Sequence, residues 1–263
     1  MDRERPADPE HAIALQERLR LHVRPTVDAE AARRPAAVAG LDAAYSLDGR
    51  WAVGAVAVLA PATLEVLDRA VAVGEVDFPY VPGLLAFREL PALLAALHRL
   101  GTQPDLLLVD GNGLLHPRRF GLACHLGVLT GLPTIGVAKS GSLRAAPPPA
   151  SARGSTAPIV DGPDELGRAL RTQLGTRPVF VSVGHRIDLD SACAHVLGLA
   201  VHHRVPEPLR QAHLLARATL RAGQRAAGAP TSERTTSAAR ASERSFSRAQ
   251  IRGSGLSPQS VVK

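Results

Sequence analysis

The alternation of apolar and polar positions along the chain predicts one helix followed by three strands. The helix covers about residues 8–23, because Asp8 is a favoured N-cap and Pro9 suits the first helical position. Three β-prone runs follow the helix, at residues 36–46, 51–60 and 63–76. Asp48-Gly49 between the first two runs is a hairpin signal, so we expect three strands in an antiparallel meander.

The pattern beyond the meander predicts helices that alternate with short strands. Residues 83–100 predict a helix that is kinked or restarted at Pro91. Further strands are expected to end at Asp110 and to cover residues 133–138, 157–160 and 177–184, and further helices to cover 120–130, 191–201 and 206–222. This order is typical of a ribonuclease-H-like α/β fold. Such a fold has a central mixed sheet, with three antiparallel strands followed by parallel strands, and helices on both faces.

Charge and composition divide the chain into a folded domain and a tail. Of the seven excess positive charges, five belong to residues 222–263, a segment rich in Ser, Ala and Arg with few large apolar residues. We expect one domain over residues 1–222 and a disordered basic tail over 223–263, which either attracts nucleic-acid phosphates or is an inert solubilising segment. Cys124 and Cys193 form no disulfide or zinc pattern, and the charged N-terminus lacks a signal peptide. We therefore expect a cytoplasmic protein without membrane spans.

Two aspartates fall on strands that are neighbours in this fold. Asp42 lies in the first predicted strand, and Asp110 ends the apolar run 106–109, at the carboxyl end of a strand where ligands gather. Two carboxylates this close repel each other unless a cation lies between them, and oxygen ligands suit Mg²⁺ or Mn²⁺. The alternative for Asp110 is a strand-ending residue that caps the next turn.

A third carboxylate, Glu89, lies on the apolar stripe of its helix. It is four residues after Leu85 and four before Leu93, so a helix that covers the sheet would direct Glu89 toward the aspartates. The alternative is an exposed ion-pair partner for Arg88 or Arg99. A carboxylate cluster that holds a metal can activate water for hydrolysis of a phosphodiester.

Lys139 and two histidines complete the candidate chemistry. Of the 31 basic residues 29 are Arg, and Lys139 is the only Lys before the last position. Lys is a compact cation suited to neutralising charge that develops on a phosphate, although chance survival of one Lys is the alternative. His116 and His213 can hydrogen-bond a phosphate or leaving group or contact the metal shell; the alternatives are a solvated loop His and an ordinary helix His.

Tyr80 is held in a loop between two prolines, Pro79 and Pro82. A rigidly presented aromatic ring suits a wedge in a base stack or a platform for a base. The alternative is a ring that packs beneath its own loop.

Six segments carry motifs that occur in the same order in one known family. They are PYVPG (79–83), FRE (87–89), VDGNGLLHPRRFGLACHLGV (109–128), PTIGVAKS (133–140), VSVGHRI (181–187) and RVPEPLRQAH (204–213). Together they closely resemble the endonuclease V family over nearly all of residues 36–222. The chain departs from the family at His203, where Tyr is expected, and in the loop that follows Lys139-Ser140.

The resemblance implies a Mg²⁺-dependent endonuclease of DNA repair, with Mn²⁺ as a substitute. It implies recognition of deoxyinosine, the deaminated form of deoxyadenosine, and hydrolysis of the second phosphodiester bond 3′ to the lesion, leaving a 3′-OH and a 5′-phosphate. The implied partner is DNA containing deoxyinosine, with inosine-containing RNA as a further candidate. A monomer is expected, because no exposed apolar helix stripe requires a partner.

The resemblance also implies roles for individual residues. The implied metal ligands are Asp42, Glu89 and Asp110, with Lys139 as the active-site cation and His116 and His213 as supporting residues. The implied substrate-binding residues are Tyr80 with Pro79 and Pro82, the main chain near Gly83, Leu85, Gly111 and Gly136, and Arg204. Glycine at such positions lets the backbone approach a flat base edge. Three alternatives to this function are another metal nuclease of the same fold, a non-catalytic lesion-binding protein and a phosphatase for small molecules.

Overall fold

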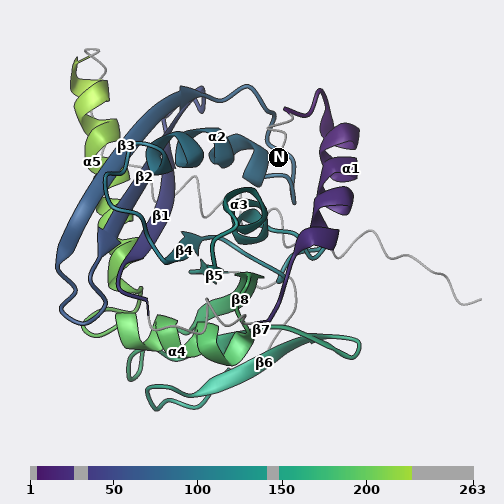
Figure 1. The fold of residues 1–263 in the computed structure, drawn as a ribbon, viewed down its shortest axis with the longest axis vertical. Coiled ribbons are helices and arrows are strands. Elements are labelled where there is room, and N and C mark those ends of the chain that lie inside the picture. Colours follow the sequence, from purple (N-terminus) through teal and green to yellow (C-terminus); the bar gives the residue numbers. More distant parts are fainter. Residues whose placement is uncertain (1–4, 27–34, 141–147, 227–263) are drawn as a thin grey trace, which may run out of the picture. The chain divides into compact units, whose positions relative to one another are not determined.

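A central sheet of eight strands organises the computed structural model, which describes residues 5–26, 35–140 and 148–226 (Figure 1). The strand order is β3-β2-β1-β4-β5-β8-β7-β6. The strands are β1 (Val38–Tyr45), β2 (Trp51–Leu59), β3 (Val66–Glu75), β4 (Leu106–Asp110), β5 (Thr134–Ala138), β6 (Thr156–Asp161), β7 (Asp164–Leu170) and β8 (Val179–His185). Most of the predicted tail and the loop after Ser140 lie outside the described residues.

The pairing of the strands confirms the ribonuclease-H-like class. Strands β1, β2 and β3 form the antiparallel meander, and β1 pairs in parallel with β4, which pairs in parallel with β5. The sheet then continues through β8, β7 and β6, all antiparallel to their neighbours. The predicted adjacency of the first and fourth strands is thus confirmed, and it determines where the aspartates meet.

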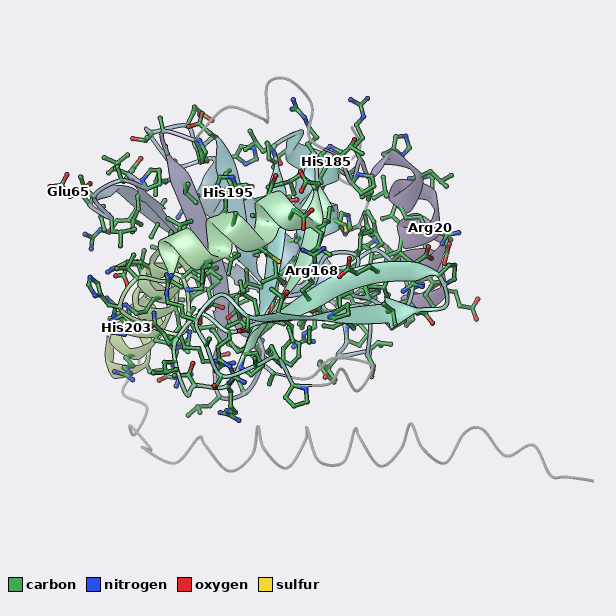
Figure 2. The ribbon with its side chains drawn as sticks, turned by 90° about the horizontal axis from the view of Figure 1, so that it is seen from below. Arg20, Glu65, Arg168, His185, His195 and His203 are labelled. Atoms are coloured by element: carbon green, nitrogen blue, oxygen red, sulfur yellow. The ribbon has the colours of Figure 1, made fainter. Side chains whose placement is uncertain are left out.

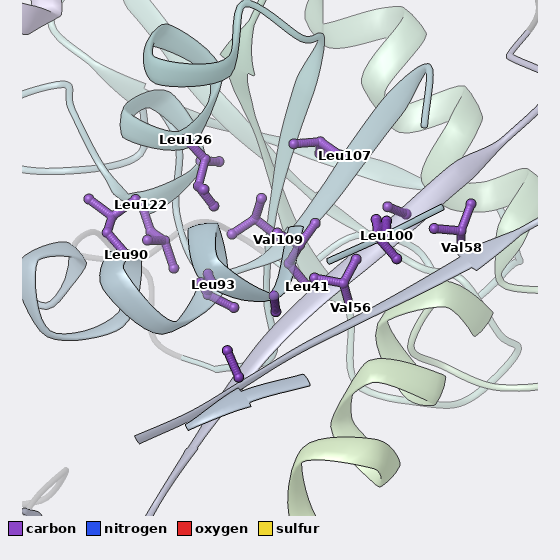
Figure 3. Close-up of a cluster of buried hydrophobic side chains, with 14 of the residues drawn as sticks. Leu41, Val56, Val58, Leu90, Leu93, Leu100, Leu107, Val109, Leu122 and Leu126 are labelled. Carbon is purple, nitrogen blue, oxygen red and sulfur yellow. The ribbon is translucent and has the colours of Figure 1, made fainter. Parts of the chain in front are cut away.

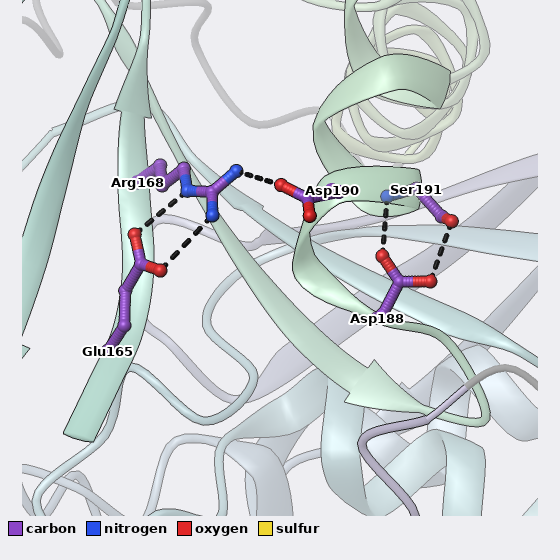
Figure 4. A network of polar contacts seen from close by, with 5 residues as sticks. All are labelled: Glu165, Arg168, Asp188, Asp190 and Ser191. Carbon is purple, nitrogen blue, oxygen red and sulfur yellow. Dashed lines mark hydrogen bonds and ion pairs between the residues drawn. The ribbon is translucent and has the colours of Figure 1, made fainter.

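Strand β7 is the one strand of this sheet that the sequence pattern did not predict. Its residues DELGRAL carry charges and a glycine that weaken a strand signal. Gly167 is required there because a Cβ atom would lie 2.5 Å from the carbonyl oxygen of Val181 on β8. Arg168 is held in place by Glu165 and by Asp190 at the start of α4 (Figure 4). Tertiary contacts therefore stabilise a strand that local propensity does not favour.

The described residues form five α-helices, and helices cover both faces of the sheet, as predicted. They are α1 (Pro9–Leu19), α2 (Ala86–Leu97), α3 (Leu122–Thr130), α4 (Leu189–Leu199) and α5 (Glu207–Ala226). A short 3₁₀ turn, Arg20–His22, follows α1. Helices α2 and α3 pack on one face and α4 with the start of α5 on the other. Figure 2 views the molecule from below, with His195 labelled on α4 and Arg168 on β7.

Two helices differ in detail from the prediction. Helix α2 passes through Pro91 as one continuous helix, so the expected restart does not occur. Pro91 lies in the second turn, where it removes only one backbone hydrogen bond. Helix α5 ends at Ala226, about one turn beyond the expected end. No helix among the described residues is both long enough and apolar enough to cross a membrane.

The core is divided by the sheet, because successive side chains of a strand point to opposite faces. Leu107 and Val109 of β4 pack with Leu93 and Leu126 beneath α2 and α3 (Figure 3). Leu106 and Leu108 pack on the opposite face, in a second cluster that includes Val38, Ile135, Val181, Val196 of α4 and Leu209 of α5. Each fully buried Leu stabilises the fold by about 1.5–3 kcal/mol. Asp110 follows the same alternation, so its side chain lies on the same face of the sheet as those of Leu106 and Leu108.

Candidate active site

Asp42 and Asp110 occupy adjacent positions on the parallel strands β1 and β4. Leu41 pairs with Val109, so the next residue of each strand is one of the two aspartates. Asp42 is buried, and its carboxylate accepts hydrogen bonds from the Ala43 amide at 2.9 Å and from Nδ1 of His213 at 2.6 Å. The pair that sequence reasoning placed side by side is therefore brought together.

The pKa values of the two carboxylates are shifted in opposite directions. Burial raises the pKa of Asp42, but the hydrogen bond from His213 and the charge of Lys139 outweigh this effect and leave the pKa below its usual value. Burial and the neighbouring charge of Asp42 raise the pKa of Asp110 to about 6. Two carboxylates that share one buried site repel each other, and ionisation of the second is therefore disfavoured.

Glu89 is the third carboxylate of the site, and it lies on the buried face of α2. Burial, followed by the charges of Asp42 and Asp110, raises its pKa to about 8. The hydroxyl of Tyr45 donates a hydrogen bond to Oε1 of Glu89 at 3.2 Å. No role for Tyr45 was predicted from the sequence, although Tyr45 is one of only two tyrosines and follows Asp42 by three residues.

The alternative role for Glu89, an exposed ion-pair partner, is wrong. Arg88 donates to the carbonyl of Phe78 at 2.6 Å and its guanidinium lies 5.2 Å from the centre of the Tyr45 ring. Arg99 donates to the carbonyl of Val71 at 2.6 Å. The carboxylate of Glu89 faces the interior, as its place on the apolar stripe of α2 indicated.

Lys139 follows directly after β5 and forms an ion pair with Oδ2 of Asp110. Arg204 holds the neighbouring backbone, because its guanidinium donates to the carbonyl of Lys139 and, at 3.1 Å, to that of Pro178. Arg204 itself is fixed by Thr172, whose hydroxyl donates to the Arg204 carbonyl at 2.6 Å. Lys139, which was predicted from the scarcity of Lys, thus contacts Asp110. Arg204 fixes the backbone of Lys139.

His213 reaches the site because α5 begins directly on β1. A Cβ atom on Gly40 would lie 2.1 Å from the carbonyl carbon of Pro208, so only glycine allows the two backbones to approach this closely. His213 follows five residues after Pro208 and contacts Asp42. Its side chain is 45% exposed, so the imidazole touches both the buried carboxylate and solvent.

The ring of His116 contacts the backbone of two loops and not the three carboxylates. Its Nε2 donates to the carbonyl of Gly83 at 2.9 Å, and its Nδ1 accepts from the amide of Arg118 at 3.2 Å. Burial lowers its pKa to about 4, so the ring is neutral near pH 7. Both ring nitrogens are engaged with protein groups, and the predicted contact of His116 with a phosphate or the metal shell stays a prediction.

Glycines bring the loop after β4 close to β5. A Cβ atom on Gly136 would lie 2.8 Å from the carbonyl oxygen of Gly111 and 2.5 Å from the amide nitrogen of Gly113. The amide of Gly111 donates to the carbonyl of Val137 at 3.3 Å, and that of Gly113 to the hydroxyl of Ser182 at 2.8 Å. The main chain that the resemblance assigns to the substrate pocket is therefore closely packed at Gly111 and Gly136.

The loop before α2 presents an aromatic ring to solvent. Tyr80 is 67% exposed, so it does not pack beneath its loop, and Pro79, Pro82 and Leu85 are exposed with it. Gly83 closes the loop with φ at +79°, a conformation that favours glycine. The role of this loop in substrate binding stays a prediction.

The three carboxylates do not form a closed metal cage. Within residues 5–26, 35–140 and 148–226, no group of three or more His, Cys, Asp or Glu side chains has the spacing of a preformed metal site. Asp42, Asp110 and Glu89 nevertheless share one electrostatic environment, in which each affects the ionisation of another. Their assignment as metal ligands stays a prediction.

Known proteins match this chain over most of its length. The sequence model of the endonuclease V family matches residues 17–214. Endonuclease V of Streptomyces avermitilis is 55% identical over 218 residues, which are 82% of this chain and 94% of that protein. The chain belongs to the endonuclease V family. The resemblance inferred from the six motifs is confirmed, and membership of the family makes the chain a nuclease, a hydrolase that acts on DNA.

Solved structures of endonuclease V agree with the sequence comparison. The crystal structure of the Streptomyces avermitilis protein matches with a TM-score of 0.79 at 53% identity, covering 85% of this chain and 98% of that one. A Ciona intestinalis endonuclease V, crystallised with a 23mer DNA containing an inosine followed by a ribo-adenosine, matches with a TM-score of 0.72 at 29% identity. That match covers 81% of this chain and 97% of the other. The fold is therefore that of endonuclease V.

Proposed function

We propose that this endonuclease V is a Mg²⁺-dependent enzyme of DNA repair that recognises deoxyinosine in DNA. It hydrolyses the second phosphodiester bond 3′ to the lesion and leaves a 3′-OH and a 5′-phosphate. The observation that carries the proposal is the group of three carboxylates with Lys139 beside it, in which Asp42 and Glu89 are buried and Asp110 is partly buried. The inosine-containing DNA bound to the Ciona intestinalis relative supports the choice of lesion.

The chemistry of the donor set fits a divalent cation. Burial and mutual repulsion raise the pKa of Glu89 and Asp110, and the only cation that contacts either carboxylate among the described residues is Lys139. Carboxylate oxygens are ligands that Mg²⁺ prefers, with Mn²⁺ as a substitute. Asp42, Glu89 and Asp110 would hold the ion. When bound, such an ion activates water and stabilises charge in an in-line displacement at phosphorus.

The other residues of the site have separate tasks. His213 orients Asp42 through its 2.6 Å hydrogen bond, and its exposed edge is free to contact the strand. Lys139 neutralises charge on the phosphate, and Arg204 keeps Lys139 in position. Tyr80 fills the space that the turned-out base leaves in the stack.

The base itself is recognised mainly by main-chain groups in this proposal. The close packing of Gly111 against Gly136 leaves no side chain between the loop after β4 and strand β5. Backbone donors and acceptors near these glycines, Gly83 and Leu85 can then approach the edge of hypoxanthine. Inosine in RNA presents the same base and is a second candidate substrate.

We also propose that the protein acts as a monomer in the cytoplasm. Cys124 and Cys193 are both free and buried, which fits a reducing compartment. The tail beyond residue 226 carries a net positive charge and is proposed to add attraction to DNA phosphates that does not depend on sequence.

A cleavage assay tests the proposed function. End-labelled single- and double-stranded oligonucleotides, DNA or RNA, with one inosine or none, are incubated with the protein and Mg²⁺ or EDTA. We expect a nick one nucleotide 3′ to inosine only with Mg²⁺. Binding to inosine DNA without cleavage under any metal would instead favour a lesion-binding protein, and cleavage that ignores inosine would favour another nuclease of this fold.

A further inference from the structure

A fully buried glutamine on α1 joins the N-terminal helix to the loop that carries Tyr80. Nε2 of Gln16 donates to the carbonyl of Gly83 at 3.1 Å and to that of Phe120 at 3.3 Å. Its Oε1 accepts a hydrogen bond from Nε of Arg118 at 2.6 Å. All polar atoms of this side chain are thus engaged with the loop before α2 and the loop between β4 and α3.

Three side chains converge on the carbonyl oxygen of Gly83. Besides Gln16, Nε2 of His116 donates to it at 2.9 Å and Nη2 of Arg118 at 2.7 Å. A carbonyl oxygen has two lone pairs, so two donors already satisfy it. The third donor further restrains the position of the Gly83 carbonyl. Gly83 also has φ at +79°, a conformation that favours glycine, and a Cβ atom there would lie 2.8 Å from Nη2 of Arg118 and displace that side chain.

The packing of α1 does not by itself require a polar side chain at position 16. Its neighbours Ala12, Leu15 and Leu19 belong to an apolar cluster that includes Phe87 and Phe120. A buried amide destabilises the fold unless its hydrogen bonds are made, whereas an apolar residue of similar size would fill the same space without that cost. The buried amide of Gln16 is therefore better explained by its hydrogen bonds to the two loops than by its packing in the apolar cluster.

We infer that Gln16 and Arg118 are positioning residues for lesion recognition. They fix the carbonyl of Gly83, and with it the loop of Tyr80, in the arrangement that receives the turned-out base. This inference rests on the proposed function. A loop that is already ordered loses less entropy when DNA binds, so the network acts on affinity for the lesion and not on the hydrolytic step.

The chain offers a direct probe of the loop, since its two tyrosines lie in different environments. Tyr45 is largely buried and Tyr80 is exposed, so protein labelled with 3-fluorotyrosine should give two separate ¹⁹F resonances, assigned with Tyr80→Phe. Gln16→Met keeps the length of the side chain and removes its hydrogen bonds. Gln173→Met is the matched control, because Nε2 of Gln173 also donates to backbone carbonyls, at Ala200 and Val201.

In Gln16→Met we expect the Tyr80 resonance to shift or broaden while the Tyr45 resonance stays unchanged. KM for inosine DNA should rise about tenfold, as expected for the loss of hydrogen bonds worth about 1.4 kcal/mol, with kcat changed by less than about twofold. Gln16→Glu, which keeps an acceptor for Arg118, should fall between wild type and Gln16→Met. Gln173→Met should match wild type in both readouts.

The inference is overturned if either the Tyr80 resonance or KM is unchanged in Gln16→Met, or if kcat alone falls. If Gln16→Met does not fold, Arg118→Lys replaces it, because Arg118 is partly exposed and Lys keeps the positive charge but cannot donate to Gln16 and to Gly83 at the same time as the guanidinium does. If wild-type protein cleaves DNA with and without inosine equally, or cleaves neither, the proposed function is refuted separately. In that case the Tyr80 resonance still decides whether Gln16 holds the loop.

Discussion

Nδ1 of His213 lies 2.6 Å from Oδ2 of Asp42, so the last helix contacts the first strand at the candidate metal site. Groups that orient a metal ligand affect the affinity for the metal about 10- to 100-fold. We therefore expect His213→Ala to raise the Mg²⁺ concentration for half-maximal cleavage by about that factor. A Mg²⁺ titration of the cleavage rate measures this. His202→Ala, which removes an exposed histidine near the start of α5, is the control and should leave the titration unchanged.

Glu89→Gln is expected to make the stability of the metal-free protein less dependent on pH below about pH 8. The pKa of Glu89 is raised from 4.5 to about 8, so between these values the folded state holds a proton that the unfolded chain has lost. The free energy of unfolding of wild type should therefore fall as pH rises through this window, by up to about 1.4 kcal/mol per pH unit. Gln keeps an acceptor for Tyr45 but does not ionise, so the variant should lose this slope.

Urea unfolding in EDTA at several values between pH 6 and pH 8 tests the prediction. The pKa of Asp110 is about 6, so its own contribution to the slope is mostly complete below this range. Glu65→Gln serves as the control, because Glu65 is exposed and should leave the slope as in wild type. Equal slopes for wild type and Glu89→Gln would show that Glu89 is ionised in the folded protein without metal.

Asp110→Asn is expected to abolish cleavage while binding to inosine DNA survives in part. Asn keeps the size of the side chain at the end of β4 but removes the charge that pairs with Lys139 and that would bind the metal. Gel-shift affinity and cleavage measured on the same inosine oligonucleotide separate the two effects. Unchanged turnover would remove Asp110 from the metal site, and equal loss of binding to plain and inosine DNA would point to misfolding.

The sequence predicted the parts of the site that depend on regular elements. Asp42 and Asp110 meet because β1 and β4 are neighbours in the fold, and Glu89 is buried because the period of its helix places it on the apolar stripe. The contact between Tyr45 and Glu89 was not predictable, since it depends on how α2 is placed over the end of β1. Strand periodicity alone gives no information about that placement.

Loop contacts were the least predictable part of the candidate site. His116 engages Gly83, which lies 33 residues earlier, and Gln16 engages Phe120, which lies 104 residues later. Neither pairing has a local signal, because both depend on how separate loops pack after the sheet and helices have formed. For the same reason β7 was missed, since Gly167 is explained by its neighbour on β8 and Arg168 in part by its ion pair with Asp190 on α4.

Tyr80→Ala is expected to weaken binding to inosine DNA by about 1–3 kcal/mol, because an exposed ring that stacks on a base contributes this much. Fluorescence anisotropy with inosine and plain oligonucleotides measures the difference. Tyr80→Phe keeps the ring and should retain most of the affinity. If Tyr80→Ala binds both oligonucleotides as wild type does, the ring has no role as a wedge.

Removal of residues 227–263 is expected to reduce the salt dependence of DNA binding without affecting the fold. This segment contains five Arg, one Lys and two Glu, and a basic segment that neutralises phosphates releases counterions. The slope of log K against log salt should become less negative by about 0.9 for each phosphate that the tail no longer neutralises. The same change is expected in a full-length variant with the five Arg changed to Gln, which separates charge from chain length. An identical slope in all three proteins would show that the tail is inert, and a change only on deletion would show that it acts through something other than charge.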